Sequence, residues 1–312
     1  MRGRCRSSLA KWLPSSASAA VLETSGHPQD CQPTLPAFPN REPDNREPQQ
    51  AGLYKMSTIV SPRRNAEPNE EIEARLQAQI EPFDSFWEAP EDIEKGYSSF
   101  HKFYEHNYLQ YIPRQKDARI LVTSCGPGYF VNLLSKSGYT DVLGIDSDAS
   151  KVRWAETKGL NCRVARAFTF LASNRQPFDV IFVEQEINHL TKEEVREFLE
   201  LCRRNLGDSG ILIVHSLNGA NPITGAEALA QNFDHFYTLT EYSLRQLLES
   251  CGFGDVRVVP LNLYVFYSNP LNYVALSIHA LTSLICSLYF RLYGKTNRIF
   301  SKKIAAICRR KD

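Results

Sequence analysis

The sequence lacks the cysteine spacings that zinc sites and disulfide frameworks require. Its eight cysteines are scattered along the whole chain, with no C-x-x-C pair among them and no His-x-x-x-His beside them. This pattern argues against a zinc ribbon and against a disulfide-stapled scaffold. It favours cysteines that are buried as small apolar side chains in a reducing compartment.

An excess of charge of either sign is also missing. The 36 basic and 35 acidic side chains leave a formal charge of +1. This balance excludes a globally basic nucleic-acid-binding protein and an acidic disordered protein. Hydrophobic residues make up 43% of the 312 residues. A chain of this length and composition can bury a full core as one large domain or two small ones.

Residues 1–66 lack apolar periodicity. Eight of the 17 prolines fall there, and such a segment cannot bury enough surface to offset its ordering entropy. We therefore predict a disordered N-terminal extension. Its basic start resembles a targeting peptide, but Pro14 follows Leu13 and leaves no apolar stretch of useful length. Met56, the only methionine besides Met1, is an alternative translation start by hypothesis.

A helical cap is expected over residues 67–115. It contains a charged helix over 70–80 and a second helix within 89–111. In the second helix, aromatic side chains recur at spacings of three and four, which indicates one face of a helix. This face either packs onto a core or lines a substrate entrance. Its members are Phe100, Phe103, Tyr104 and Tyr108.

Residues 116–312 alternate between buried strands and helices. Single helices between strands imply right-handed crossovers and a parallel sheet that is covered on both faces. We predict an α/β fold with a doubly wound, mostly parallel seven-stranded sheet and a helical N-terminal extension. The expected strands are 118–123, 140–146, 162–166, 178–183, 210–216, 256–259 and 304–308, and the expected helices are 131–137, 150–158, 192–206 and 240–250.

The first predicted strand ends in a turn that contains two glycines, Ser124-Cys125-Gly126-Pro127-Gly128. Glycines let the backbone turn tightly and let a ligand lie against it. A helix follows directly, so its free N–H groups face that ligand. The second strand ends at Asp146, whose carboxylate can accept both hydroxyls of a ribose. The combination predicts a nucleoside-cofactor site. Val131 stands where the dinucleotide fingerprint has its third glycine, which argues against NAD.

The stretch from about Ser85 to Arg310 resembles the class I S-adenosylmethionine-dependent methyltransferases. The turn matches the later part of the family's D-x-G-x-G-x-G loop, with Val122 in place of the acid and Ser124 in place of the first glycine. The resemblance implies a Rossmann-like methyltransferase domain over 116–312 and S-adenosyl-L-methionine as cofactor. It places the cofactor-binding residues at Ser124, Cys125, Gly126, Pro127, Gly128, Asp146, Ser147, Phe168 and Glu184.

Phe168 stands where the family commonly has an acid near the adenine. A phenylalanine there can only stack on the base or offer its backbone N–H. Glu184 opens a run that resembles the acidic loop after the family's fourth strand.

The C-terminal half carries a narrower resemblance. Residues 218–222, 232–236 and 293–306 are similar to bacterial methyltransferases of surface-polysaccharide biosynthesis, encoded in O-antigen and capsule clusters. This resemblance implies O-methylation of a sugar or a lipid-linked glycan.

A sugar hydroxyl has a high pKa, so a general base assists its methylation, and histidine is the usual base near neutral pH. We rank His189 first, His235 second and His215 third as catalytic candidates. His189 and His215 lie at carboxyl ends of predicted strands, where open α/β sheets bind ligands. His235 lies in a predicted lid over 218–238.

Residues 270–290 contain no charged side chain. The segment is long enough to span a membrane, but the strand at 304–308 must return to the same sheet, which disfavours a span. We expect a helical insertion over 266–300 that is either buried against the sheet or lies on an anionic membrane surface. The second reading predicts a cytoplasmic enzyme with peripheral binding at the inner face of the membrane. The basic residues that support it are Arg291, Lys295, Arg298, Lys302, Lys303, Arg309, Arg310 and Lys311.

Two alternatives to a glycan methyltransferase stay open. The methyl acceptor can be a quinone precursor, another small metabolite or a protein. The chain can also be a non-catalytic cofactor-binding module, which the departures at Val122 and Ser124 favour.

The partners that we expect are a small-molecule or glycan acceptor and an anionic membrane. Nucleic acid is not expected, because Glu184-Gln185-Glu186-Ile187 replaces an N-P-P-Y-type loop. No metal site is predicted, although Glu184, Glu186 and Asp234 could supply oxygen ligands.

Overall fold

The computed structural model describes residues 71–72, 74, 90–184, 186–231, 235–261 and 271–311. Residues 71, 72 and 74 are helical, in agreement with the charged helix expected over 70–80. The predicted N-terminal extension over 1–66, with Met56, lies outside the described residues.

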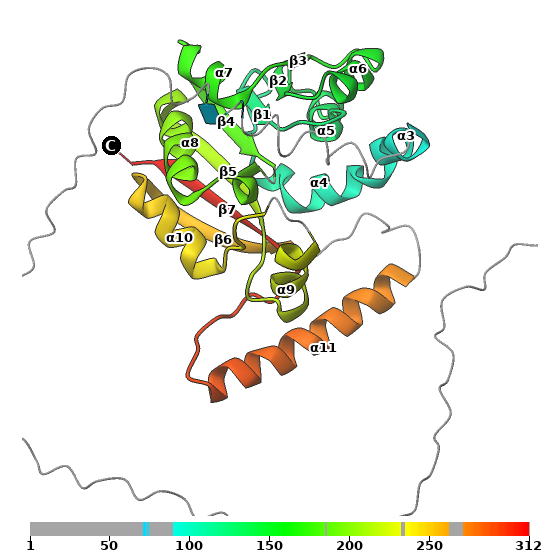
Figure 1. Ribbon diagram of the computed structural model, residues 1–312. Helices are drawn as coiled ribbons and strands as arrows, with labels where there is room; N and C mark the ends of the chain where they lie inside the picture. The colour runs from blue at the N-terminus through cyan, green and yellow to red at the C-terminus, as the bar shows by residue number, and fades with distance from the viewer. Residues whose placement is uncertain are drawn as a thin grey trace, which may run out of the picture. The chain divides into compact units, whose positions relative to one another are not determined.

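In the described part of the chain the strands form a seven-stranded sheet in the order β3-β2-β1-β4-β5-β7-β6 (Figure 1). Neighbouring strands from β3 to β5 run parallel, and β7 runs antiparallel to both β5 and β6. The predicted doubly wound, mostly parallel sheet is confirmed. The strands are β1 Arg119–Thr123, β2 Asp141–Asp146, β3 Cys162–Val164, β4 Phe178–Val183, β5 Leu206–Leu217, β6 Phe253–Leu261 and β7 Lys303–Arg310.

Helices α7 and α9 were not predicted from the sequence pattern, nor was the 3-10 turn η3. Both helices are short, and α9 falls inside the segment predicted as a lid. The helices and 3-10 turns are α3 Pro90–Ser99, α4 His101–Asn107, η2 Leu109–Tyr111, α5 Tyr129–Lys136, α6 Ala149–Thr157, α7 Ala167–Ser173, η3 Glu186–His189, α8 Lys192–Asn205, α9 Pro222–Gln231, α10 Glu241–Ser250 and α11 Leu271–Leu292.

The sheet is covered on both faces because successive strand residues point to opposite sides. Leu121 belongs to one core cluster, together with Phe198 of α8, and its neighbour Val122 belongs to the other, together with Phe130 of α5. Residues 180–183 of β4 are all apolar, and their side chains alternate between the two cores. This arrangement leaves the carboxyl ends of the parallel strands as the edge at which polar residues gather.

The aromatic face of α4 packs onto the core. Tyr104 and Tyr108 are buried, and the ring of Tyr108 meets the ring of Phe182 edge-on at a centroid distance of 4.8 Å. The ring of Tyr104 stacks on Phe130 at 5.1 Å. Of the two interpretations of the aromatic spacing, core packing is therefore confirmed.

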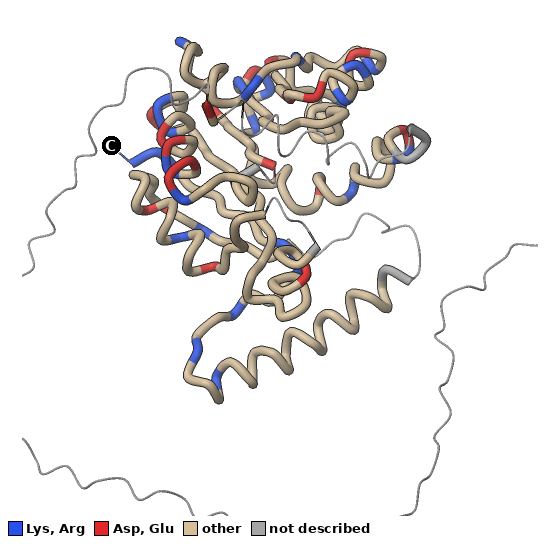
Figure 2. The backbone as a smooth tube through the Cα atoms, in the orientation of Figure 1, with Lys and Arg blue, Asp and Glu red and all other residues tan. Residues whose placement is uncertain are grey.

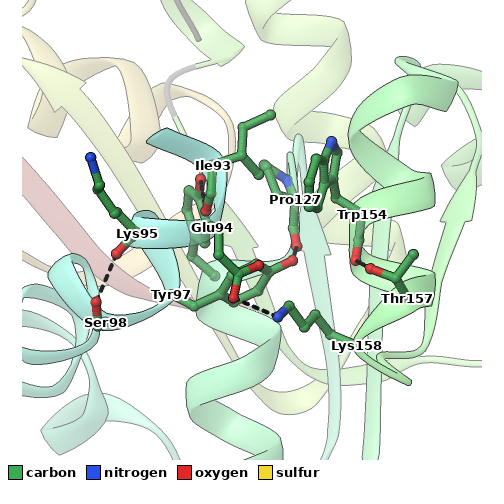
Figure 3. Close-up of polar contacts among 10 residues, drawn as sticks. Ile93, Glu94, Lys95, Tyr97, Ser98, Pro127, Trp154, Thr157 and Lys158 are labelled. Atoms are coloured by element: carbon green, nitrogen blue, oxygen red, sulfur yellow. Dashed lines mark hydrogen bonds and ion pairs between the residues drawn. The ribbon is translucent and has the colours of Figure 1, made fainter. Parts of the chain in front are cut away.

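Helix α3 is bound to the glycine turn and to α6 (Figure 3). The hydroxyl of Tyr97 donates a hydrogen bond to the carbonyl of Pro127 at 2.5 Å, and Lys158 pairs with Glu94 at 2.7 Å. The hydroxyl of Tyr129 donates to the carbonyl of Ile93 at 3.0 Å. The helical cap thus holds the turn from the N-terminal side.

We expect Gly96→Ala to undock α3, because a Cβ at Gly96 would lie 2.3 Å from the ring of Tyr129. That ring is buried and stacks on Phe100 at 5.0 Å, so the clash should cost about 1–3 kcal/mol of unfolding free energy. Denaturant unfolding measures this cost. In a double-mutant cycle, Gly96→Ala should cost much less in a Tyr129→Leu background. An equal cost in both backgrounds would contradict the docking contact.

The exposure of α11 decides against one of the two interpretations of the uncharged segment. It was expected to be either buried against the sheet or on a membrane surface, and its large apolar side chains, including Leu281 and Leu288, are exposed. Among the described residues, the stretch Tyr273–Leu292 is long and apolar enough to cross a membrane, and none of it is buried. The buried interpretation is therefore wrong, because nothing in the described part of the sheet covers this helix.

The described cysteines agree with the sequence prediction of unpaired, mostly buried side chains. All six are free. Cys125, Cys162, Cys202 and Cys308 are buried, and Cys251 and Cys286 are half-buried.

Candidate active site

The turn after β1 adopts a backbone that favours glycine at three positions. Gly126 and Gly128 have φ values of +53° and +82°, and Ser124 has a φ of +50°. The N–H of Cys125 donates to the carbonyl of Ile145 at 3.0 Å, which ties the turn to β2. Ser124, the departure from the family's first glycine, therefore keeps the left-handed backbone that a glycine would supply, at a cost in strain.

The two glycines of the turn have different surroundings. A Cβ on Gly126 would have no atom within 4 Å, whereas one on Gly128 would lie 3.0 Å from Leu160 and 3.2 Å from Ala155. The backbone at Gly126 is therefore open to a ligand, and Gly128 lets the turn pack closely on α6. Helix α5 begins at Tyr129, so its first N–H groups lie beside this opening.

Asp146 ends β2 beside the turn, as predicted. Its Oδ2 accepts a hydrogen bond from the N–H of Gly126 at 2.7 Å, and its Oδ1 accepts one from the N–H of Asp148 at 2.9 Å. Burial raises the pKa of Asp146, and the two backbone N–H groups partly offset this increase. Each carboxylate oxygen keeps a further lone pair for a ribose hydroxyl. Ser147 follows and is exposed.

The side chain of Phe168 does not face the turn. It is buried and its ring packs on Phe198 at 5.4 Å in the core, so stacking on an adenine is excluded in this conformation. Its backbone N–H lies in the first turn of α7, where helix N–H groups lack partners within the helix. Of the two predicted roles of Phe168, the backbone role is the one that the geometry allows.

Glu184 follows β4 and receives a hydrogen bond from a distant helix. The hydroxyl of Tyr104 in α4 donates to its Oε1. Lys303, at the start of β7, lies within electrostatic range of Glu184, and burial lowers the pKa of the lysine to about 8 although Glu184 opposes the shift. Tyr104 and Lys303 were not among the predicted site residues. No local motif marks them, because both belong to segments far from Glu184 in the sequence.

His189 and His235 are brought together. Their ring centroids lie 4.6 Å apart in an edge-on arrangement. Nδ1 of His235 lies 2.9 Å from the carbonyl of Ala228 in α9. A carbonyl only accepts hydrogen bonds, so it favours the tautomer in which Nδ1 carries the proton and Nε2 can accept one. The N–H of Phe236 donates to the carbonyl of Asn188 at 3.0 Å, which holds the predicted lid against η3.

His215, the third-ranked histidine, is fully buried in β5. Neither ring nitrogen has a hydrogen-bond partner within the described residues, and the rings of Phe103 and Tyr108 lie at 6.4 and 6.1 Å. Burial lowers the pKa of His215 far below its ordinary value, and the charge on Lys303 lowers it further. This burial disfavours a direct role of His215 in proton transfer to or from an acceptor.

The neutral state of His215 predicts a pH-dependent stability. The unfolded chain binds a proton at this histidine below about pH 6.5 and the folded chain does not. Stability contributed by His215 is therefore constant above pH 6.5 and falls by about 1.4 kcal/mol per pH unit below it, down to the lowered pKa. Denaturant unfolding between pH 7 and 5 tests this. His215→Leu should remove that slope, and His106→Leu, at an exposed position, should retain it. An unchanged slope in His215→Leu would contradict the assignment.

Asn218 and Asn221 of the predicted lid fix the backbone before β7. The side-chain amide of Asn218 donates to the carbonyls of Ile299 and Ser301, and that of Asn221 donates to the carbonyl of Phe300. These amides are used in the fold and hold the predicted lid to the segment before β7. Asn232, Phe233 and Asp234, which also belong to the predicted lid, lie outside the described residues.

Within the described residues, no three His, Cys, Asp or Glu side chains gather as possible metal ligands. Asp234 and the side chain of Glu186, two of the three oxygen donors considered from the sequence, lie outside the described residues. The carboxylate of Glu184 instead accepts a hydrogen bond from the hydroxyl of Tyr104.

The sequence from residue 97 to residue 258 matches the family described as methyltransferase domain. The chain belongs to this methyltransferase family. The match covers the turn, Asp146, Glu184 and the two paired histidines. Membership confirms the predicted class of S-adenosyl-L-methionine-dependent methyltransferases and its cofactor.

Solved structures show the same fold. A SAM-dependent methyltransferase from Archaeoglobus fulgidus is similar with a TM-score of 0.52 and 20% identity, over 70% of this methyltransferase and 97% of its own chain. The methyltransferase in complex with the Haloferax volcanii Trm112 activator is similar with a TM-score of 0.51 and 14% identity, over 74% and 96% of the two chains. No protein of curated function matches the methyltransferase by sequence.

The turn fits the cofactor of this family. The N–H of Gly126 donates to the carboxylate of Asp146 at 2.7 Å, and a Cβ on Gly126 would have no atom within 4 Å. The open backbone of the turn and the carboxylate therefore lie side by side. A ligand with a diol can therefore lie against the turn and reach the carboxylate without a side chain in its path.

Proposed function

We propose that this methyltransferase transfers a methyl group to a hydroxyl of a sugar, either free or linked to a lipid. The observation that carries the proposal is the pair of histidines, His189 and His235, at 4.6 Å. His189 follows β4 and His235 follows β5 and α9, at the carboxyl edge of the sheet that also carries the glycine turn after β1. An alcohol needs such a base because its own pKa is high.

The residues that would hold the cofactor are those of the turn and Asp146. Asp146 would accept the ribose hydroxyls, Gly126 would leave room for the adenosine, and the N–H of Phe168 would face the base. The cofactor supplies a methyl group on a sulfonium, which needs no activation by the protein beyond correct placement and exclusion of water.

The paired histidines would move the proton. The cofactor would supply the methyl group, and its sulfur would keep the electron pair of the broken carbon–sulfur bond. The acceptor hydroxyl would give its proton to an imidazole nitrogen of the pair, and the carbonyl of Ala228 would hold His235 in the tautomer whose Nε2 can accept it. The lid segment around His235 is fixed to η3 and would limit access of water.

The sugar as acceptor is supported by the resemblance of segments 218–222, 232–236 and 293–306 to methyltransferases of surface-polysaccharide biosynthesis. The alternative of a non-catalytic module rested on Val122 and Ser124. Ser124 keeps a glycine-like backbone, which removes part of the support for that alternative.

Transfer of a labelled methyl group into a cell-envelope extract tests the proposal. The label is expected in the glycan or glycolipid fraction, as an acid-stable methyl ether that NMR distinguishes from a methylamine. Label confined to proteins or to quinones would contradict it. The His189→Ala variant is the control for transfer that does not depend on the site.

A further inference from the structure

Helix α11 presents an exposed apolar stripe. Its apolar residues recur at alternating spacings of four and three, which places them on one face of the helix. Their side chains are between 45% and 84% exposed, far more than a soluble protein leaves open on one contiguous face. The stripe consists of Val274, Ile278, Leu281, Ile285, Leu288 and Leu292.

The rest of α11 also suits an apolar surrounding. From Leu271 to Phe290 the helix has no charged residue. The hydroxyls of Ser277 and Thr282 donate to the carbonyls of Tyr273 and Ile278, one turn earlier, at 2.9 Å. These polar groups are thus satisfied within the helix, which lowers the cost of placing them next to hydrocarbon.

The C-terminal end of α11 is basic and aromatic. Arg291, Lys295 and Arg298 are exposed, and Tyr289 and Tyr293 lie beside them. Figure 2 shows basic residues on this end and on the loop that follows, with no acidic residue among them. Tyrosines prefer the membrane–water interface, and each basic residue there is attracted to anionic headgroups.

The topology places both ends of α11 on one side of any membrane. The strand before the helix, β6, ends at Leu261, and the strand after it, β7, begins at Lys303. These two residues are paired in the sheet. A chain that crossed a bilayer in α11 would have to return through hydrocarbon without regular hydrogen bonding, which membranes do not allow. At a membrane, α11 would therefore lie along the surface rather than across the bilayer.

The loop after α11 is fixed to the carboxyl edge of the sheet. The hydroxyl of Tyr242 donates to the carbonyl of Thr296 at 2.8 Å, and the N–H of Arg298 donates to Glu241 at 2.9 Å. Asn221, next to the end of β5, holds Phe300. The helix is thus attached to the edge that carries the paired histidines.

We infer that α11 docks this methyltransferase on the surface of an anionic lipid bilayer, with the apolar stripe in the acyl boundary and Arg291, Lys295 and Arg298 at the headgroups. Docking at this edge would bring a lipid-linked acceptor to the site, a consequence that rests on the proposed function. A second copy of the chain is a less suitable occupant, because an extended helix pair relies on charged flanking positions and α11 has none before Arg291.

Vesicle flotation of the full chain tests docking. We expect the protein to float with vesicles of phosphatidylcholine and about 30% phosphatidylglycerol at low salt, and to float poorly with phosphatidylcholine alone or at high salt. Ile278→Gln with Leu281→Gln and Leu288→Gln should abolish flotation. Arg291→Ser with Lys295→Ser and Arg298→Ser should weaken anionic binding about 100-fold, since each basic residue contributes about fivefold.

A matched control removes three exposed basic residues elsewhere, Lys136, Arg153 and Arg163, and should float like the wild type. Recovery of the wild type in the soluble fraction with both vesicles would overturn docking, as would equal loss in the control. A stable dimer in solution that the glutamine variant dissociates would assign the stripe to a second copy and overturn it as well. Calorimetric titration of the same preparations with S-adenosylhomocysteine separates a failure of docking from a failure of the proposed function. The docking variants should bind S-adenosylhomocysteine with wild-type affinity.

Discussion

Replacing Asp146 by asparagine is expected to weaken S-adenosylmethionine binding by about 100-fold, or about 3 kcal/mol. The carboxylate accepts hydrogen bonds from two backbone N–H groups, of Gly126 and Asp148. An amide presents its NH2 to one of these donors, so the turn loses a contact at the same time as the diol of the ribose loses a charged acceptor. Isothermal titration calorimetry measures the affinity directly.

The matched control is Asp141→Asn, at the other end of β2, where the side chain is exposed. It should leave the affinity unchanged. Asp146→Asn should still unfold cooperatively, so that the loss of binding is not a loss of fold. Wild-type affinity in a folded Asp146→Asn variant would show that the cofactor lies elsewhere.

His189→Ala is expected to lower kcat by about 100-fold, the range that a positioned general base supplies. His235→Ala should lower kcat by a similar factor, because the two rings meet at 4.6 Å and act as one unit. The double variant should therefore lose little more than either single variant. Steady-state kinetics with the glycan acceptor provide kcat and KM separately.

Binding of S-adenosylhomocysteine should be unchanged in all three histidine variants, since His189 follows β4 and His235 follows β5, whereas the cofactor turn follows β1. Multiplicative losses in the double variant would mean that the histidines act independently. Wild-type kcat in both single variants would remove the pair from the mechanism.

The sheet could be predicted from the sequence because its central strands are buried on both faces. Residues 180–183 of β4 form a continuous apolar run, and a single helix between two such runs favours the parallel, right-handed arrangement. Asp146 could be placed beside the glycine turn for the same reason, since adjacent parallel strands bring their carboxyl ends together. These inferences rest on local patterns that tertiary contacts do not alter.

The less local features could not be predicted. Glu184 receives a hydrogen bond from Tyr104, 80 residues earlier. Lys303, at the start of β7, comes within electrostatic range of the same group because β7 inserts between β5 and β6. Helix α11 is ambiguous because an uncharged helix suits a protein core and a membrane equally well. The orientation of the Phe168 side chain could not be predicted either. It depends on α7, a short helix without a strong apolar periodicity.

A crystal structure with S-adenosylhomocysteine bound tests the central claim most directly. The adenosine is expected against the open side of Gly126, with both ribose hydroxyls within about 3 Å of the carboxylate oxygens of Asp146. A nucleoside bound at another edge of the sheet, or a ribose that makes no contact with Asp146, would contradict the assignment of the site.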